Sequence, residues 1–402
     1  MGRWLVPREE LTVEQVRSVE LPMDENRLVS GGPGSGKTLV LAHRAQFLME
    51  DLGIEPDRLR IFVYTKTLAA YIRDGLEDLG IPEECVSTFD SWCYELFREH
   101  VRGVNSWDPV EKRPRFDIVR AEVLKLFESG RLGMMFDVVL VDEAQDLPAD
   151  AFKILRRAAR HITICLDHKQ RIYDAGVDDD NIRYLLGIKR TNIALLQTFR
   201  CSPYIVALAA AFLDDPEISR QFRKQTQTSQ GDRETPVLYS CPSAEVEREK
   251  LIELVTLRAQ RGGRIGLLFP QRRQAWGYAQ ALREAGLYVE EGKEIDFDTD
   301  APKAMTIASA KGLTFDSVLV PRLSKAGFGP AENGRIERML FMAATRATDW
   351  VAFMTSRDDL GLEERLESLA NEGKVRIDTG ENRIEPQRPK PDWLDDSPMD
   401  LL

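Results

Sequence analysis

Residues 30–38 read SGGPGSGKT, and this stretch decides the fold. Gly31, Gly36, Lys37 and Thr38 complete a GxxxxGK pattern that is followed by a threonine. Glycines let backbone N–H groups turn onto phosphate oxygens, the lysine brings a cation to the β and γ phosphates, and the hydroxyl completes a magnesium shell. The stretch therefore predicts a bound nucleoside triphosphate with Mg²⁺. The predicted nucleotide contacts are Gly31, Gly32, Pro33, Gly34, Ser35, Gly36, Lys37 and Thr38, and Thr38 is also a predicted metal ligand.

The segments around this loop indicate an α/β fold. Residues 26–30 resemble a strand and residues 39–49 favour a helix, so we expect the loop between a strand and a helix N-terminus. Further continuous aliphatic or β-branched runs occupy residues 59–65, 136–141, 162–166 and 192–196, and a second series occupies residues 236–239, 265–269, 305–308 and 317–320. Continuous runs separated by helix-like stretches are typical of parallel sheets buried on both faces. The sequence predicts two such sheets, with a polar stretch at residues 214–233.

Length and composition describe a globular chain of more than one domain. The chain has 402 residues, of which 43% are hydrophobic and 30% charged. No apolar run approaches a membrane span, and residues 1–10 are too charged for a signal peptide, so we expect a cytoplasmic protein without a membrane partner. The five cysteines are odd in number and form no CxxC pair, so we expect reduced thiols and no metal besides the nucleotide's magnesium.

The charge balance gives no direct sign of a nucleic-acid binder, because the net charge is -11. Local basic clusters nevertheless occur at residues 112–115, at residues 220–224, and at Arg272 and Arg273 beside Trp276. Such clusters are most often solvated faces, but a local basic groove can hold a strand while the outer surface stays acidic.

A second motif occupies residues 137–146, which read DVVLVDEAQD. An apolar strand ends there in two acids. In phosphate-transfer sites this arrangement lets the first acid, Asp142, hold the magnesium shell while the second, Glu143, orients and deprotonates the attacking water. Acids at a strand end are common. Two acids at a strand end that comes one long segment after a phosphate loop are, however, a specific signal of a phosphate-transfer site.

The DEAQD sequence at residues 142–146 resembles the superfamily 1 helicases of the UvrD/Rep type. Other segments resemble further motifs of that family in the same order: residues 11–15 (LTVEQ), 64–68 (YTKTL), 86–92 (VSTFDSW), 167–173 (DHKQRIY), 197–202 (QTFRCS), 308–315 (ASAKGLTF) and 338–347 (RMLFMAATRA). The resemblance runs from about residue 11 to about residue 355.

The resemblance implies two tandem RecA-like P-loop NTPase domains with parallel sheets and an ATP cleft between them. We expect the first domain at residues 1–198, with a short helical insertion at residues 93–136, and the second at residues 199–358. Residues 359–402 are expected to form an acidic helix followed by a Pro-rich, unpacked tail.

The resemblance also implies roles for individual residues. Gln15 is expected at the adenine and Gly312 at the nucleotide, while Asp142 joins Thr38 as a metal ligand. The expected catalytic residues are Glu143, Gln170, Arg200 and Arg346, of which Gln170 senses the γ-phosphate and the two arginines stabilise the transition state. The expected DNA contacts are Tyr64, Thr65, Lys66, Thr88, Phe89, Trp92, Tyr173 and Arg272.

Several positions depart from the family pattern: Leu166 replaces a glycine, Ala175 lies near the place of a stacking aromatic, Thr314 replaces a glutamate, Asp90 replaces a histidine, and Phe199 and Phe341 replace tyrosines. The hydrolytic residues are intact, whereas base-stacking and ribose contacts are weakened. The family's large helical insertions also have little room within residues 93–136 or 269–311. We therefore expect a compact motor core, and the residues present support ATP turnover better than they support efficient unwinding.

Two functions remain open from the sequence. The first is an ATP-dependent translocase or helicase on single-stranded DNA, moving 3′ to 5′ as the resemblance implies, with RNA as an alternative strand. The second is a DNA-stimulated switch or loading subunit of a repair or anti-phage complex with a partner nuclease. The acidic charge, the short insertions and the tail DWLDDSPMDLL at residues 392–402 motivate it.

Two further classes are disfavoured. Residues 291–293 and 372–374 match the ExK fragment of nuclease sites, but neither place has room for a nuclease fold. A metabolic kinase or a transporter ATPase has no place for the DEAQD motif or for arginines outside the phosphate-loop domain.

Overall fold

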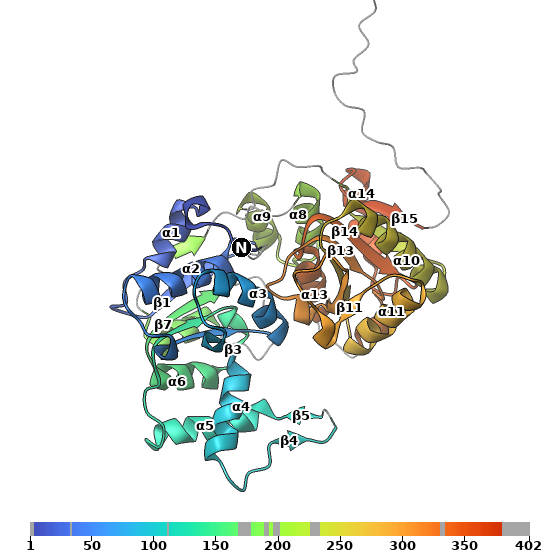
Figure 1. Cartoon of the computed structure of the whole chain (residues 1–402). Coiled ribbons are helices and arrows are strands. Elements are labelled where there is room, and N and C mark those ends of the chain that lie inside the picture. Colours follow the sequence, from blue (N-terminus) through green and yellow to red (C-terminus); the bar gives the residue numbers. More distant parts are fainter. Residues whose placement is uncertain are drawn as a thin grey trace, which may run out of the picture.

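The computed structural model describes residues 4–32, 34–110, 112–167, 178–188, 193–195, 202–225, 234–329 and 334–379. They form two lobes side by side, each built on a parallel sheet with helices packed against it (Figure 1). The predicted α/β class with two parallel sheets is confirmed. No helix in the described ranges is long and apolar enough to cross a membrane.

The first lobe contains a six-stranded sheet in the order β3-β2-β6-β7-β1-β8. Its strands are β1 (Arg27–Gly31), β2 (Leu59–Val63), β3 (Val86–Thr88), β6 (Phe136–Val141), β7 (Ala159–Leu166) and β8 (Ile193–Leu195). Its helices are α1 (Val13–Val19), α2 (Lys37–Glu50), α3 (Lys66–Asp78), α6 (Ala149–Ala158) and α7 (Asp179–Leu186). All strand pairs are parallel, so β1, β6 and β7 end at one edge of the sheet. That edge holds the phosphate loop and both acids of the DEAQD motif.

A small helical projection lies between β3 and β6 (Figure 1). It contains α4 (Phe89–His100), the antiparallel pair β4 (Trp107–Asp108) and β5 (Arg113–Pro114), and α5 (Phe116–Glu128). Its apolar residues join the core beneath the first sheet, where Trp92 packs 5.8 Å from Phe136 between ring centroids. The projection is therefore an extension of the first lobe with a shared core.

The second lobe contains a seven-stranded sheet in the order β11-β12-β10-β13-β14-β9-β15, again with parallel pairs. Its strands are β9 (Val237–Ser240), β10 (Ile265–Phe269), β11 (Glu290–Glu291), β12 (Lys303–Thr306), β13 (Phe315–Val320), β14 (Ala347–Thr355) and β15 (Arg376–Asp378). Its helices are α8 (Pro203–Ala210), α9 (Pro216–Gln225), α10 (Ala244–Arg261), α11 (Arg272–Glu284), α12 (Lys325–Phe328), α13 (Arg335–Ala344) and α14 (Leu362–Asn371).

Short 3-10 turns occur in both lobes. They are η1 (Arg8–Glu10), η2 (Pro56–Arg58), η3 (Glu83–Cys85), η4 (Ala144–Asp146), η5 (Gly292–Glu294) and η6 (Ala308–Ala310).

The second lobe differs from the sequence-based expectation in two places. Part of the expected polar stretch forms α9, because its single buried aromatic, Phe222, packs edge-on against Phe341 at 5.2 Å. The lobe also continues past the boundary expected at residue 358, since β15 pairs in parallel with β9 and α14 buries Leu362 and Leu366 in the core. An acidic composition concealed the narrow apolar stripe of α14. Residues 380–402 lie outside the described part of the chain.

A fully buried arginine connects the elements around the phosphate loop. The Arg44 guanidinium, on α2, donates to the carbonyls of Val19 and Leu21 at 2.8 Å each and to the Thr163 hydroxyl at 3.0 Å, and lies 3.2 Å from His161 Nε2. Burial chiefly lowers the pKa of Arg44 to about 10, so it stays charged at neutral pH. The contacts fix α2 against β7 and the end of α1.

His161 makes the stability of this lobe sensitive to acid. Its burial, followed by the charge of Arg44, lowers the pKa of His161 to about 3 from 6.5. Below pH 6.5 the unfolded chain therefore binds a proton at His161, whereas the folded protein binds it only near pH 3. The free energy of unfolding consequently falls as the pH is lowered from 6.5 to about 3. The loss is at most about 1.4 kcal/mol per pH unit.

We expect His161→Gln to flatten this acid limb, measured as the free energy of unfolding in urea at successive pH values. His100→Gln, at the partly exposed C-terminal end of α4, is the matched control. Equal slopes in the His161 variant and the unmodified protein would contradict this origin of the acid sensitivity.

Candidate active site

The phosphate loop connects β1 to α2 through left-handed glycines. Gly34 has φ 72° and Gly36 has φ 85°. A Cβ atom at Gly36 would lie only 2.4 Å from Gln15 Nε2, so the loop and α1 approach too closely there for a side chain. Ser35 is 2% exposed and its hydroxyl has no hydrogen-bond partner among the described residues. A buried, unpaired hydroxyl in this turn fits an incoming phosphate oxygen. Pro33 lies outside the described residues.

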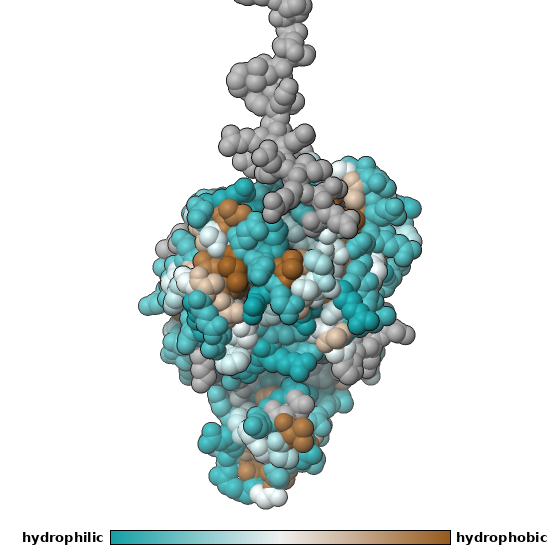
Figure 2. Space-filling model, turned by 90° about the vertical axis from the view of Figure 1, so that its right-hand side faces the viewer, coloured by the Kyte–Doolittle hydropathy of each residue, from teal (hydrophilic) through white to brown (hydrophobic). Residues whose placement is uncertain are grey.

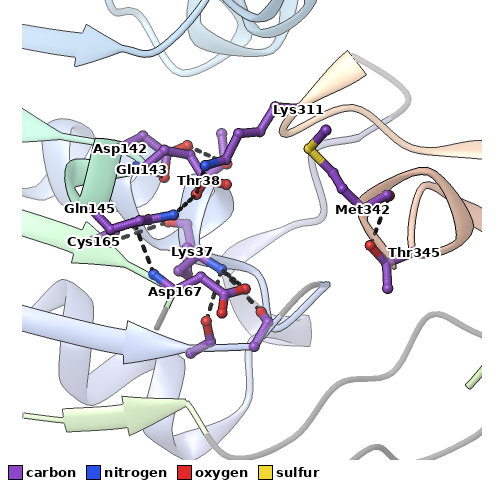
Figure 3. Close-up of polar contacts among 12 residues, drawn as sticks. Lys37, Thr38, Asp142, Glu143, Gln145, Cys165, Asp167, Lys311, Met342 and Thr345 are labelled. Carbon is purple, nitrogen blue, oxygen red and sulfur yellow. Dashed lines mark hydrogen bonds and ion pairs between the residues drawn. The ribbon is translucent and has the colours of Figure 1, made fainter. Parts of the chain in front are cut away.

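Lys37 begins α2 and points back across the loop (Figure 3). Its Nζ donates to the carbonyls of Gly31 and Gly32 at 2.9 and 3.0 Å and lies 3.5 Å from Asp167 Oδ2. Lys37 is 6% exposed, so its side chain is almost enclosed by the loop and its neighbours. Asp167, at the end of β7, is a partner that the sequence analysis did not single out.

Thr38 and Asp142 form the candidate metal site. The Thr38 hydroxyl donates to Asp142 Oδ2 at 2.6 Å. Burial, and then the neighbouring Glu143 charge, raise the pKa of Asp142 to about 6. A cation here would favour the ionised carboxylate, and Mg²⁺ prefers this kind of oxygen donor while keeping several waters. The described residues offer no cluster of three or more His, Cys, Asp or Glu side chains, so the remaining ligands would come from nucleotide and water.

Glu143 is held as an ionised carboxylate at the end of β6. Its backbone is left-handed, with φ 52°, and its Oε2 accepts from Gln145 Nε2 at 2.5 Å. Gln145 Oε1 in turn accepts from the Asp167 backbone at 3.0 Å, which ties the ends of β6 and β7 together (Figure 3). Burial alone would raise the pKa of Glu143, but the charges of Lys311, Lys37 and Arg346 outweigh it and lower the pKa to about 2. A deprotonated carboxylate at this position is what a general base requires.

Lys311 enters the site from the second lobe. Its side chain has no exposed surface, forms an ion pair with Asp146, and lies 3.4 Å from Glu143 Oε2. Its Nζ also lies 5.3 Å above the Tyr64 ring. The ion pairs outweigh the cost of burial and raise the pKa of Lys311. Only its neighbour Gly312 was among the predicted site residues, although the lysine of the KGLTF segment at residues 311–315 was a sequence signal for it.

A pocket lies between the lobes and joins residues from both. Lys37, Thr38 and Glu143 line it from the first lobe, and Gly312, Thr314 and Arg346 line it from the second. Gly312 has φ 82°, and a Cβ atom there would lie 2.7 Å from Leu68 of α3, so close contact of the lobes requires a glycine.

Arg346 faces this pocket from the end of α13. It is 5% exposed, and its guanidinium donates to the carbonyls of Met342 and Leu313 at 3.2 and 3.3 Å. Figure 3 shows Met342 and Thr345 across the pocket from the carboxylates. The arrangement brings two of the predicted catalytic residues, Glu143 and Arg346, to one pocket.

Two aromatic residues that sequence reasoning missed complete the pocket wall. Trp4 packs on Gly75, where a Cβ atom would lie 2.6 Å from the indole, and its ring centroid lies 6.3 Å from that of Tyr71. The Tyr71 hydroxyl accepts from Arg264 of the second lobe at 3.1 Å. No motif in the sequence pointed to either residue as part of the site.

The remaining predicted nucleotide residues have mixed outcomes. Gln170 and Arg200, and the predicted DNA contact Tyr173, lie outside the described residues. The Gln15 amide accepts from the Thr12 backbone at 2.9 Å and donates to the Ser35 carbonyl at 3.1 Å. It therefore supports the phosphate loop, and its role at an adenine stays a prediction.

The predicted DNA contacts need one correction. Phe89 and Trp92 are 2% and 4% exposed in the core beneath the sheet, so a base cannot stack on them, and we withdraw both. They pack with Phe62 because the start of α4 turns its apolar face inward. Thr65 and Thr88 accept from backbone N–H groups as the N-caps of α3 and α4. Tyr64 is half-buried, and Lys66 and Arg272 are exposed.

The fold and this pocket define a P-loop NTPase with a second α/β lobe closing over the phosphate loop. Residues 11–131 match the family model "UvrD/REP helicase N-terminal domain". The ATP-dependent DNA helicase PcrA of Staphylococcus epidermidis is 29% identical over 120 residues, which cover 27% of this chain and 16% of that protein. PcrA of Bacillus subtilis is 30% identical over 97 residues, covering 23% and 13% respectively. These matches support the predicted resemblance to the UvrD/Rep-type superfamily 1 helicases.

The matched segments span less than a fifth of the length of these relatives. Among solved structures, the PRRSV helicase covers 87% of this chain and 56% of its own, with 16% identity and a TM-score of 0.39.

The Lys311 ion pairs predict a specific weakening of the association between the lobes. We expect Lys311→Met to remove the buried cation beside Glu143 and Asp146 and to destabilise the closed arrangement by about 3 kcal/mol or more. Hydrogen exchange should then rise at α3 and η6, which face each other.

Lys303→Met is the matched control, since Lys303 forms a buried ion pair with Glu290 at 2.7 Å within the second lobe alone. It should raise exchange in β11 and β12 and leave α3 protected. Unchanged α3 protection in the Lys311 variant would contradict the inferred contact.

Proposed function

We propose that this chain is an ATP-dependent translocase or helicase that acts on single-stranded DNA, moving 3′ to 5′. The observation that carries the proposal is the pocket that joins Lys37, Thr38 and Glu143 of one lobe to Arg346 of the other. Such a site needs both lobes closed around a triphosphate, so the nucleotide state is coupled to the distance between them.

Each residue of the pocket has a chemical role in this proposal. Lys37 binds the β and γ phosphates, and Thr38 and Asp142 hold the magnesium ion, which neutralises phosphate charge. Glu143 accepts the proton of the attacking water, and Arg346 stabilises charge that develops on the transferred phosphate. Arg200 and Gln170 are proposed to assist at the γ-phosphate.

Lys311 extends the proposal to the coupling of the two lobes. It contacts the general base Glu143 and lies above Tyr64, one of the proposed strand contacts. One side chain of the second lobe therefore touches both the hydrolytic carboxylate and the edge where a strand is proposed to bind. A change in lobe closure moves both contacts together.

A second candidate is a DNA-stimulated ATPase switch or loading subunit that works with a partner nuclease. The short projection formed by α4 and α5 favours it, because the described ranges place little other structure beside the motor core that could engage a duplex. The net charge of -11 also suits a chain that leaves part of nucleic-acid binding to a partner.

Single-stranded DNA is expected to accelerate ATP hydrolysis, measured as phosphate release with and without oligonucleotides. Lys37→Ala and Glu143→Gln should each lower the stimulated rate by at least about 100-fold, since one loses phosphate binding and the other the base. The Glu143 variant should still bind ATP, whereas the Lys37 variant should not. Lys125→Ala and Glu128→Gln, on exposed positions of α5, are matched controls.

A basal rate that no DNA or RNA changes would overturn the proposal. Stimulation by RNA alone would keep the proposed motor activity but identify RNA, instead of DNA, as the bound strand.

Strand displacement separates the two candidate functions. A motor acting alone should unwind duplexes that carry a 3′ single-stranded tail and leave 5′-tailed duplexes intact, measured by release of a labelled strand. ATP turnover without displacement on either substrate favours the switch or loading subunit, and unwinding from the 5′ tail would reverse the proposed direction.

A further inference from the structure

The pocket between the lobes has a charged part and an apolar part. The side chains proposed to act on the phosphates line the first part, whereas Trp4, Leu39 and Tyr71 line the second. A nucleoside triphosphate is divided in the same way, because its phosphates carry the charge and its base is a flat, weakly polar ring. Once the phosphates occupy the charged part, the nucleoside is left to face the apolar residues.

Trp4 is held in place by the two helices that follow the phosphate loop, α2 and α3. Its indole packs on α3 at Gly75, where a Cβ atom would lie 2.6 Å from the nearest ring carbon. A glycine weakens a helix, so the space that the indole needs explains a glycine within α3. The chain beside Trp4 is anchored to α2, since His43 Nε2 lies 2.9 Å from the Val6 carbonyl oxygen. Specific contacts therefore fix the position of the indole at the pocket.

Core packing alone does not account for a tryptophan at this position. The Trp4 Nε1 is buried and has no hydrogen-bond partner among the described residues. Buried tryptophan N–H groups usually have a partner, and an unpaired donor costs free energy that a phenylalanine would avoid. The tryptophan is explained instead by the larger aromatic surface that it adds to the pocket wall.

Tyr71 continues this wall and connects it to the second lobe, which α3 faces (Figure 1). Its ring centroid lies 6.3 Å from that of Trp4 and 5.0 Å from that of Phe297, which it meets edge-on. Its hydroxyl accepts from Arg264 at 3.1 Å. Phe297 and Arg264 belong to the second lobe, so the Tyr71 ring is held at the pocket by contacts from both lobes.

Gln15, the residue expected at the base, is engaged elsewhere. Its amide oxygen accepts from the Thr12 backbone at 2.9 Å, and its amide nitrogen donates to the Ser35 carbonyl at 3.1 Å. Gln15 is not one of the residues that line the pocket. A hydrogen bond from Gln15 to a base would require this amide to rearrange, whereas the aromatic wall faces the pocket as it stands.

The outer surface contrasts with this enclosed wall. On the face of the molecule that Figure 2 shows, hydrophobic residues lie in small separate patches among hydrophilic ones. Trp4 and Tyr71 are each only 7% exposed, because the pocket encloses the surface that they leave open. A flat ring that enters beside them removes apolar surface from water on both partners.

We propose that Trp4 and Tyr71 hold the nucleoside of the bound triphosphate by aromatic contact and thereby set the nucleotide preference. Aromatic contact tolerates different bases, because every base has a π-face, and it favours the two-ring purines for their larger surface. The site therefore accepts adenine and guanine alike and binds pyrimidines less tightly. The proposal rests on the proposed function, since it assigns the part of the ATP site that holds the nucleoside.

The test separates the nucleoside from the phosphates. We expect Trp4→Ala to weaken binding of a non-hydrolysable ATP analogue by about tenfold, measured by titration calorimetry. Its affinity for inorganic triphosphate should stay unchanged. Trp4→Phe keeps a ring and should stay within about threefold of the unmodified protein. Gly75→Ala, which displaces the indole without removing it, should weaken the ATP analogue and again leave inorganic triphosphate unaffected.

The nucleotide preference is measured on the unmodified protein with non-hydrolysable analogues. Those of ATP, 2′-deoxy-ATP and GTP should bind within about threefold of one another, and that of CTP about fivefold more weakly. Gln15→Ala should lower the affinity for the ATP and GTP analogues equally, because a support of the phosphate loop serves both. Trp276→Ala, at a 58% exposed position of α11 outside the pocket, is the matched control and should change none of these values. Thermal unfolding of each variant verifies that the fold is intact.

Three results would overturn the proposal. The first is an unchanged affinity for the ATP analogue in both the Trp4→Ala and Gly75→Ala variants. The second is an equal loss for inorganic triphosphate, which would make Trp4 a support of the phosphate loop. The third is a strong preference for ATP over GTP that Gln15→Ala abolishes, which would assign the base to Gln15. None of these measurements contains DNA, so a failure of DNA to stimulate hydrolysis would reject the proposed motor and leave the nucleoside contact standing.

Discussion

The contact on which the site depends is the buried cluster of Lys311 with Glu143 and Asp146. Removing three charged groups from water costs several kcal/mol per ion, and only close opposite charges and further hydrogen bonds offset that cost. Lys311 supplies the opposite charge from the second lobe, and Gln145 supplies the additional hydrogen bond to Glu143. Closure of the lobes therefore adds to the lowering of the pKa of Glu143 that Lys37 of the first lobe already provides.

A related constraint acts beneath the phosphate loop. Arg44 is buried without a carboxylate, and its charge is accommodated by carbonyls, a hydroxyl and a neutral histidine. These acceptors lie at the end of α1, in the segment after it and on β7, so α2 cannot slide relative to β7 without exposing an unsatisfied cation. Lys37 and Thr38 at the start of α2 thus keep their positions relative to Asp142 and Asp167. These contacts hold the phosphate loop from within the first lobe, whereas the Lys311 contacts cross from the second lobe.

The sequence predicted local and periodic features well. Continuous apolar runs identified the parallel strands, and the spacing of GxxxxGK and DEAQD located Lys37, Thr38, Asp142 and Glu143, which the structure brings to one sheet edge. Contacts between distant segments carried no such signal. Trp4 enters the pocket because Gly75 leaves space for its indole, and α14 packs through an apolar stripe that its acidic composition concealed.

The error about Phe89 and Trp92 has a physical cause with consequences for the strand path. Aromatic residues after a strand suit base stacking or core packing equally well, and only the direction of the helix face decides between them. In α4 that face turns toward Phe62 and Phe136, so the first lobe uses these rings in its own core. On α11 the same residue type is left uncovered beside unpaired guanidinium groups. Among the described aromatic residues predicted to contact a strand in the first lobe, the half-buried Tyr64 is thus the one whose ring is not enclosed in the core.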